Sequence, residues 1–177
     1  MTYQQGISRD SPTAILAVID QSTSMNQSLS IGRTKATFLA DVLNKTLYAI
    51  VTNCSKADGV RDYFYVGVIA YSAGSARNGF FGPLGQEPLQ PISRIAEMPL
   101  RIERRIKQVV GNDDKITEQS IKFPIWFEPK SRGNTSMCAG LTAASDVIKD
   151  WCAAHPNGFR FEAFVRIIAW SRVLPNP

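Results

Sequence analysis

The chain has 177 residues, of which 44% are hydrophobic and 20% charged, and its net charge is +5 at pH 7. A chain of this length is expected to form one domain whose core needs no metal or disulfide. The composition excludes collagen-like and low-complexity proteins. No apolar stretch approaches the ~20 residues of a membrane-spanning helix. Residues 1–11 are polar and contain no apolar signal segment, so we expect a cytoplasmic protein.

The first half of the chain alternates strand and helix patterns. After an N-terminal arm (1–12), the apolar run 13–19 predicts a strand buried on both faces. Residues 35–51 carry leucines at helical spacing and predict an amphipathic helix. Residues 62–72, rich in aromatic and β-branched side chains, predict a second buried strand.

The second half begins with the Gly- and Pro-rich stretch 73–100, in which we expect one short strand at 92–95. A helix is expected over 101–110, and a third buried strand over 161–170 followed by a tail (171–177). Between them, a helix is predicted from apolar positions spaced four and three residues apart. These positions are Met137, Leu141, Ala144, Ile148 and Trp151. The order of elements indicates an α/β domain over 13–170 with a Rossmann-like, open, mostly parallel sheet flanked by helices.

A cluster of basic side chains falls within the expected helix 101–110. We interpret it as a solvated helix face, because a nucleic-acid interface usually adds interleaved aromatic residues or a motif. A nucleic-acid role is therefore only a distant alternative. The cluster consists of Arg101, Arg104, Arg105 and Lys107.

Three cysteines and one histidine show no metal-site spacing. Cys138 and Cys152 fall on one predicted helix, roughly 21 Å apart at ~1.5 Å per residue, which is too far for a disulfide. We interpret these two cysteines and Cys54 as reduced core residues. His155 is expected at a helix end.

The motif Asp20-Gln21-Ser22-Thr23-Ser24, or D-x-S-x-S, directly follows the first predicted strand. Ligands of open α/β sheets gather at the carboxyl ends of strands. One carboxylate and two hydroxyls on alternate residues can face a common point, and these hard oxygen ligands suit Mg²⁺, Mn²⁺ or Ca²⁺. The distant Gly133-Asn134-Thr135 could add a third hydroxyl, with Gly133 allowing a close backbone approach. The alternatives are a turn-forming polar loop for the first motif and an ordinary helix cap for Thr135.

The chain resembles the von Willebrand factor type A (VWA) domain at these motifs. AILAVIDQSTSM is similar to the first strand and metal loop of that family, and DYFYVGVIAYS to its second strand. PIWFEPKSRGNTSMCAGLTAASDVIKDW is similar to its threonine loop and following helix, in the style of small bacterial stand-alone members associated with tellurium resistance. The resemblance covers roughly residues 13–158.

The resemblance implies a metal-ion-dependent adhesion site with Asp20, Ser22, Ser24 and Thr135 as ligands, directly or through water. The expected ion is Mg²⁺, with Mn²⁺ or Ca²⁺ as alternatives. It further implies a protein partner whose Asp or Glu carboxylate completes the metal shell, and no catalytic activity.

The chain departs from the family after the predicted strand 161–170. The family pattern places a further acidic residue there, usually within T-D-G, whereas this chain continues Ser171-Arg172. Losing one carboxylate weakens an oxygen-ligand site, and a cation at Arg172 would repel a nearby ion. The family domain also continues for about two strand–helix units, so we interpret the chain as C-terminally truncated or frame-shifted. An apolar strand left at a sheet edge would favour self-association.

Three classes of function remain. The leading hypothesis is a protein-interaction module with a divalent-cation site, weakened by the loss of the later acid. The second is a metal-independent scaffold or inert fragment of the same fold. The third, a metal-assisted hydrolase, needs a general base near the ion, and only Asp20 itself is a candidate.

Overall fold

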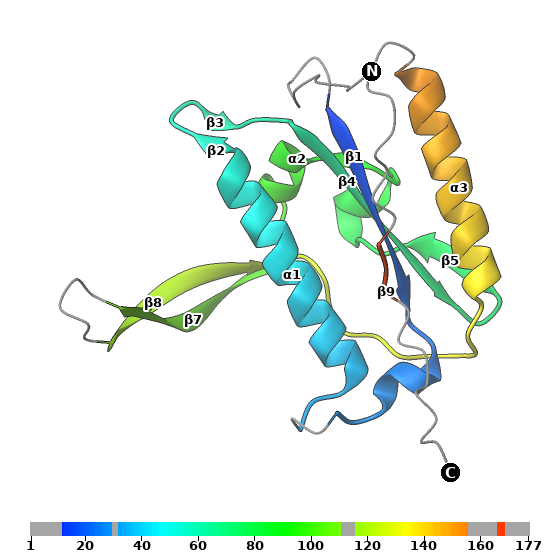
Figure 1. The fold of residues 1–177 in the computed structure, drawn as a ribbon, viewed down its shortest axis with the longest axis horizontal. Helices are drawn as coiled ribbons and strands as arrows, with labels where there is room; N and C mark the ends of the chain where they lie inside the picture. The colour runs from blue at the N-terminus through cyan, green and yellow to red at the C-terminus, as the bar shows by residue number, and fades with distance from the viewer. Residues whose placement is uncertain (1–11, 30–31, 111–115, 156–165, 169–177) are drawn as a thin grey trace, which may run out of the picture.

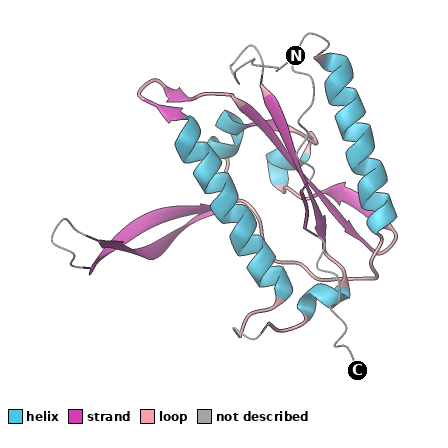
Figure 2. Cartoon of the chain, viewed as in Figure 1, coloured by secondary structure: helices cyan, strands magenta, loops and turns pink. Residues whose placement is uncertain are grey.

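The structure is a computed structural model that describes residues 12–29, 32–110, 116–155 and 166–168. It shows a mixed α/β fold in which helices flank an open sheet (Figures 1 and 2). The helical elements are η1 (Thr23–Asn26), α1 (Lys35–Cys54), η2 (Gly82–Gly85), α2 (Ile92–Glu97) and α3 (Met137–Ala154). The strands are β1 (Thr13–Asp20), β2 (Ser55–Lys56), β3 (Gly59–Val60), β4 (Phe64–Ser72), β5 (Ser75–Asn78), β6 (Gln90–Pro91), β7 (Arg101–Val110), β8 (Ile116–Ile125) and β9 (Arg166–Ile168).

The main sheet has the strand order β5-β4-β1-β9, with β6 also paired to β4. β1 and β4 are parallel over their whole common length, and β9 pairs in parallel with the C-terminal half of β1. β5 and β6 are antiparallel to β4. The expectation of a mostly parallel sheet is therefore wrong. The antiparallel pairing of β5 with β4 arises at the turn formed by Ala73 and Gly74. Their positive φ angles of 50° and 81° reverse the chain directly into β5.

The two faces of β1 and β4 bury separate clusters, as alternation along a strand requires. Ile19, Val66 and Val68 pack toward α1, among other members of the larger cluster. Val18 and Ile69 pack on the opposite face with α3. The predicted first two strands are thus confirmed as buried on both faces.

The helices predicted at 35–51 and from Met137 are confirmed as α1 and α3. The packing face of α3 differs from the expected stripe, because Met137 and Leu141 are 40% and 38% exposed. Gly140 lies against Tyr71 instead, so closely that a Cβ there would be 2.6 Å from the ring. A small residue in α3 therefore sets how near this helix lies to the sheet.

Two expected elements have the opposite secondary structure. The expected strand at 92–95 is the helix α2, with Ile92 and Ile95 fully buried. The expected helix at 101–110 is the strand β7, paired with β8 in a two-stranded hairpin that extends from the body (Figure 2). The basic cluster is thus on a strand rather than a helix face.

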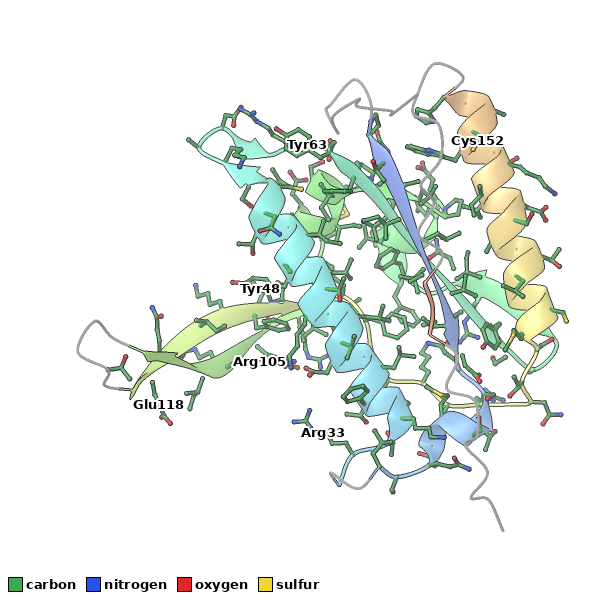
Figure 3. The ribbon with its side chains drawn as sticks, viewed as in Figure 1. Arg33, Tyr48, Tyr63, Arg105, Glu118 and Cys152 are labelled. Atoms are coloured by element: carbon green, nitrogen blue, oxygen red, sulfur yellow. The ribbon has the colours of Figure 1, made fainter. Side chains whose placement is uncertain are left out.

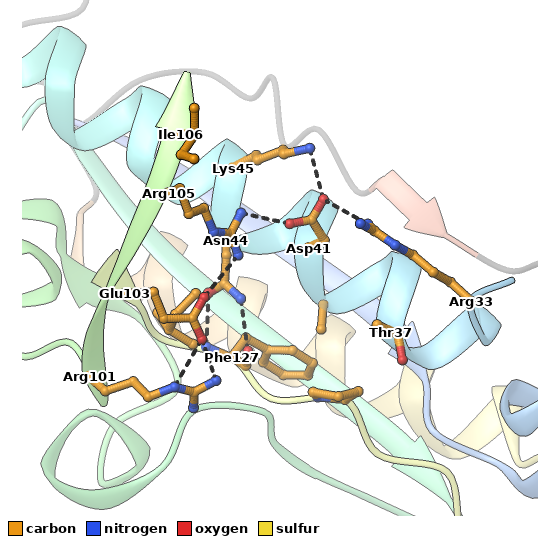
Figure 4. Close-up of a pocket in the computed structure, with 13 residues that line it drawn as sticks. Arg33, Thr37, Asp41, Asn44, Lys45, Arg101, Glu103, Arg105, Ile106 and Phe127 are labelled. Atoms are coloured by element: carbon orange, nitrogen blue, oxygen red, sulfur yellow. Dashed lines mark hydrogen bonds and ion pairs between the residues drawn. The ribbon is translucent and has the colours of Figure 1, made fainter. Parts of the chain in front are cut away.

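Ion pairs at the base of the hairpin explain this strand. Residues 101, 103 and 105 fall on one face, as alternation in a strand requires. There, Glu103 accepts hydrogen bonds from Arg101 and Arg105, and Arg105 also reaches Asp41 of α1 at 2.8 Å. Burial alone would raise the pKa of Asp41, but hydrogen bonds from Lys45 and Arg105 outweigh it and hold this pKa below its ordinary value. Two of the four basic residues, Arg101 and Arg105, are therefore paired with acids of the hairpin and α1 (Figure 4).

The cysteines within the described residues are free. Only Cys54 is a core residue, and burial raises the pKa of its thiol. Cys138 is exposed and Cys152 half-buried, so the expectation of three core cysteines is wrong for these two. His155 ends α3, as expected. None of the helices in the described part of the chain is both long and apolar enough to cross a membrane.

Several sequence-based expectations lie outside the described residues. They concern the arm before residue 12, the parts of 161–170 beyond β9, and the tail with Arg172.

Asn44 joins α1 to the chain that returns from the hairpin. Its Oδ1 accepts hydrogen bonds from the backbone N–H groups of Trp126 and Phe127 at 2.8 and 3.0 Å. Its Nδ2 donates to the carbonyl of Phe127 at 2.8 Å. Asn44 is 2% exposed, so this side chain satisfies three main-chain groups where water has little access. Nearby, Tyr48 packs on Phe123 with ring centroids 5.0 Å apart, beside Arg105 (Figure 3).

We predict that Asn44→Ala lowers the free energy of unfolding by about 3 kcal/mol, because buried backbone groups lose their partners. Urea denaturation measures this change. Asn53→Ala, at an exposed position of the same helix, is the control and should cost less than about 0.5 kcal/mol. Equal losses in the two variants would contradict the role of Asn44.

Candidate metal site

The candidate site begins where β1 ends. The β1–β4 register places Asp20 beside Tyr71, so that both strands end at the same edge of the sheet. Asp20 is 8% exposed. Its Oδ1 accepts a hydrogen bond from the backbone N–H of Ser22 at 2.7 Å. This bond turns the chain after β1 and leaves Oδ2 with no hydrogen bond from the described residues.

Three hydroxyls meet at Ser22, the residue whose backbone N–H binds this carboxylate. The Oγ atoms of Ser22 and Ser24 are 2.9 Å apart, and Thr135 Oγ1 donates to Ser22 Oγ at 2.9 Å. Ser22 and Thr135 are 113 positions apart in the chain. The structure therefore brings together all four residues that sequence reasoning named: Asp20, Ser22, Ser24 and Thr135.

The structure also bears on the two alternatives, a helix cap for Thr135 and a polar turn for the D-x-S-x-S motif. Ser136, not Thr135, is the N-cap of α3, and its side chain makes no capping hydrogen bond. Ser22 precedes η1 but makes no side-chain cap bond. Asp20 does form the local turn bond that the polar-loop alternative expects. That bond leaves the second carboxylate oxygen available, so a turn and a ligand role are compatible at Asp20.

Main-chain hydrogen bonds hold the two loops together. The carbonyl of Gly133 accepts from both the backbone N–H and the hydroxyl of Thr23, at 2.7 and 3.0 Å. Arg132 N–H donates to the carbonyl of Gln21 at 2.7 Å, and Ala73 N–H to that of Asn134 at 2.6 Å. Three segments that are distant in the sequence thus form one framework, in which main-chain bonds hold residues 132–134, directly before Thr135.

Gly133 is needed at this junction for two reasons. Its φ of 76° lies in the left-handed region that glycine adopts readily. A Cβ at this position would also lie 2.6 Å from the Cβ of Ala73. The sequence-based expectation that Gly133 permits a close backbone approach is therefore confirmed.

Tyr71 is a site residue that sequence reasoning missed. Its hydroxyl is buried and finds no hydrogen-bond partner among the described residues. Burial raises the pKa of the Tyr71 phenol, and the negative charge of Asp20 raises it further. The phenol is therefore neutral at ordinary pH and brings no second negative charge to the site. In the sequence, Tyr71 looks like an ordinary aromatic core residue. Only the register of β1 and β4, which pairs Tyr71 with Asp20, shows that it lies at the site.

The donor set can be compared with what a hard cation requires. Mg²⁺ takes oxygen ligands at ~2.1 Å in octahedral geometry, which puts adjacent ligands ~3 Å apart. Both hydroxyl–hydroxyl distances are 2.9 Å, which is compatible with this spacing and is also the length of an ordinary hydrogen bond. Ser24 and Thr135 are exposed whereas Asp20 and Ser22 are buried, which leaves one side open to a ligand from solution. Within the described residues no group of three or more His, Cys, Asp or Glu side chains could hold a metal, so one carboxylate supplies the charge of this cluster.

The chain was compared with protein-family models, curated proteins and solved structures, and none of them matches it.

We predict that Gly133→Ala destabilises the protein more than Gly32→Ala does. Both residues have φ near +70°, so each alanine costs about 1 kcal/mol in backbone strain. Only Gly133 adds a steric conflict, because a Cβ at Gly32 would meet nothing within 4 Å. Urea denaturation of both variants compares the losses, and equal losses would contradict the close packing of Gly133 on Ala73.

Proposed function

We propose that the protein is an interaction module that binds a divalent cation and, through it, a carboxylate of a protein partner. The observation that carries this proposal is the meeting of Asp20, Ser22, Ser24 and Thr135 from two distant loops. This arrangement agrees with the resemblance to the VWA family. We therefore propose that the protein has a VWA-like, Rossmann-like fold, and we also propose a cytoplasmic location.

In this proposal, the four side chains hold the ion, with Mg²⁺ the first choice and Mn²⁺ or Ca²⁺ as alternatives. A bound ion would supply a positive charge that attracts an acidic partner. The chain's own part is to orient the hydroxyls, through the hydrogen bonds of Gly133 to Thr23 and of Arg132 to Gln21. We propose a binding role rather than a catalytic one.

A metal-independent scaffold is the second candidate, and one observation favours it. The loops are already joined by main-chain hydrogen bonds, and the three hydroxyls satisfy one another without an ion. In this case the cluster would serve only to fix the loop between the hairpin and α3.

We predict that millimolar Mg²⁺ or Mn²⁺ raises the melting temperature relative to EDTA. An ion that binds only the native state adds ~2.7 kcal/mol at a hundredfold excess over its Kd, which for this chain length is a rise of several °C, since each kcal/mol is worth ~2–4 °C. Asp20→Asn should abolish the rise, because it removes the charge but keeps an oxygen that can accept from Ser22 N–H. Thr135→Val should reduce it.

Asp146→Asn is the matched control, since Asp146 is an exposed acid paired only with Lys149 among the described residues. It should leave the cation-dependent rise unchanged. A cooperative transition that no cation shifts would favour the scaffold. A shift that survives Asp20→Asn would place the ion elsewhere and contradict the proposal.

A further inference from the structure

A second feature lies directly beside the four-oxygen cluster. A cleft of about 580 Å³ opens between the loops after β1, β4 and β8. It includes Gln21, which lies between two of the proposed ligands, and Gly133, which positions Thr135. The cleft and the cluster are therefore built from the same loops, and one ligand could contact both.

Three cations line this cleft: Arg77 from β5, and Lys130 and Arg132 from the loop before α3. No Asp or Glu is among the lining residues. Within the described part of the chain, none of the three forms an ion pair with a carboxylate. By contrast, the groove between α1 and the hairpin has its arginines paired with Asp41 and Glu103.

The cations are held in place without being neutralised. Arg77 donates a hydrogen bond to the side-chain oxygen of Gln21, and the Lys130 ammonium lies 3.7 Å from the centroid of the Phe81 ring. Burial lowers the pKa of Lys130, and the nearby charge of Arg77 lowers it further. An anion between these two groups would relieve their repulsion.

Gln21 supplies an unused donor at the same place. The residue is 2% exposed, and its Nε2 has no hydrogen-bond partner among the described residues. Rotating the amide would not help, since the NH₂ group would then face the Arg77 guanidinium. A buried donor without an acceptor is costly, and an anionic oxygen in the cleft is the kind of acceptor it lacks.

We propose that this basic cleft, formed by Gln21, Arg77, Lys130 and Arg132, binds a second carboxylate of the acidic protein segment whose first carboxylate binds the metal site. This inference rests on the proposed function. It narrows the partner to a segment with at least two acidic side chains close together. A carboxylate is the expected anion because, under the proposed function, the metal site beside the cleft already binds a carboxylate of the same protein segment.

The test is calorimetric titration with a capped tetraglutamate peptide at low ionic strength, in EDTA and in Mg²⁺. Tetraglutamine is the uncharged control peptide. The double variant Arg77→Gln/Lys130→Gln should bind tetraglutamate about tenfold more weakly in both buffers, because two attractive charges are lost. Lys56→Gln/Lys122→Gln removes the same charge from exposed lysines outside the cleft and should change the affinity less than about twofold. Thermal melts verify that each variant is folded, and Arg77→Lys should retain most of the binding.

The outcomes separate this inference from the proposed function. Binding in EDTA that depends on Arg77 and Lys130 but not on Asp20 supports the cleft even if no cation raises the melting temperature. Binding that needs Mg²⁺ and Asp20 but ignores the cleft variant would overturn the inference and leave the proposed function intact. Equal effects of the two double variants, or tighter binding of inorganic phosphate than of the peptide, would also overturn it.

Discussion

The parallel pairing of β1 with β4 is the constraint on which the rest of the structure depends. Both strands are buried between α1 and α3, so their register is fixed by packing on two faces at once. This register ends both strands at one edge, with Asp20 beside Tyr71. The loops that follow must then emerge together, and the only carboxylate of the cluster lies where they meet.

A second constraint fixes the segment that runs from the hairpin to α3. Asn44 fixes the backbone at Trp126 and Phe127, where the hairpin rejoins the body. From there the chain reaches Gly133, whose carbonyl bonds to Thr23 and whose missing Cβ admits Ala73. Both ends of the loop that carries Lys130, Arg132 and Thr135 are thus held by hydrogen bonds, and such preorganisation favours binding.

The proposed metal site and the basic cleft would both attract negatively charged groups. Under the proposed function, a cation held by the carboxylate and three hydroxyls of the cluster would present positive charge to a ligand. The neighbouring cleft with its unpaired cations would do the same. The neutral Tyr71 phenol behind Asp20 adds no charge of its own. Under the proposed function, an acidic segment would therefore find complementary charge at two adjacent points, which favours selection of that segment over neutral ones.

The sequence predicted the first two buried strands from their apolar and β-branched residues, and both long helices from apolar residues at helical spacing. It also named the four residues that the structure brings together, since D-x-S-x-S follows a strand and Thr135 precedes a helix. It failed at 101–110, where the alternating charges Arg101, Glu103 and Arg105 suit a strand but were interpreted as a helix face. Gln21 and Tyr71 were missed because only tertiary structure distinguishes them from an ordinary loop residue and an ordinary core residue.

The most direct test of the metal site is a titration with Mn²⁺ followed by ¹H–¹⁵N NMR, since a paramagnetic ion broadens the signals of nearby amides. The account predicts that the amides of Ser22, Ser24 and Thr135 broaden first, and that Asp20→Asn prevents this. Broadening that begins instead at exposed acids such as Asp146, or that is the same throughout the protein, would contradict a metal site at these loops.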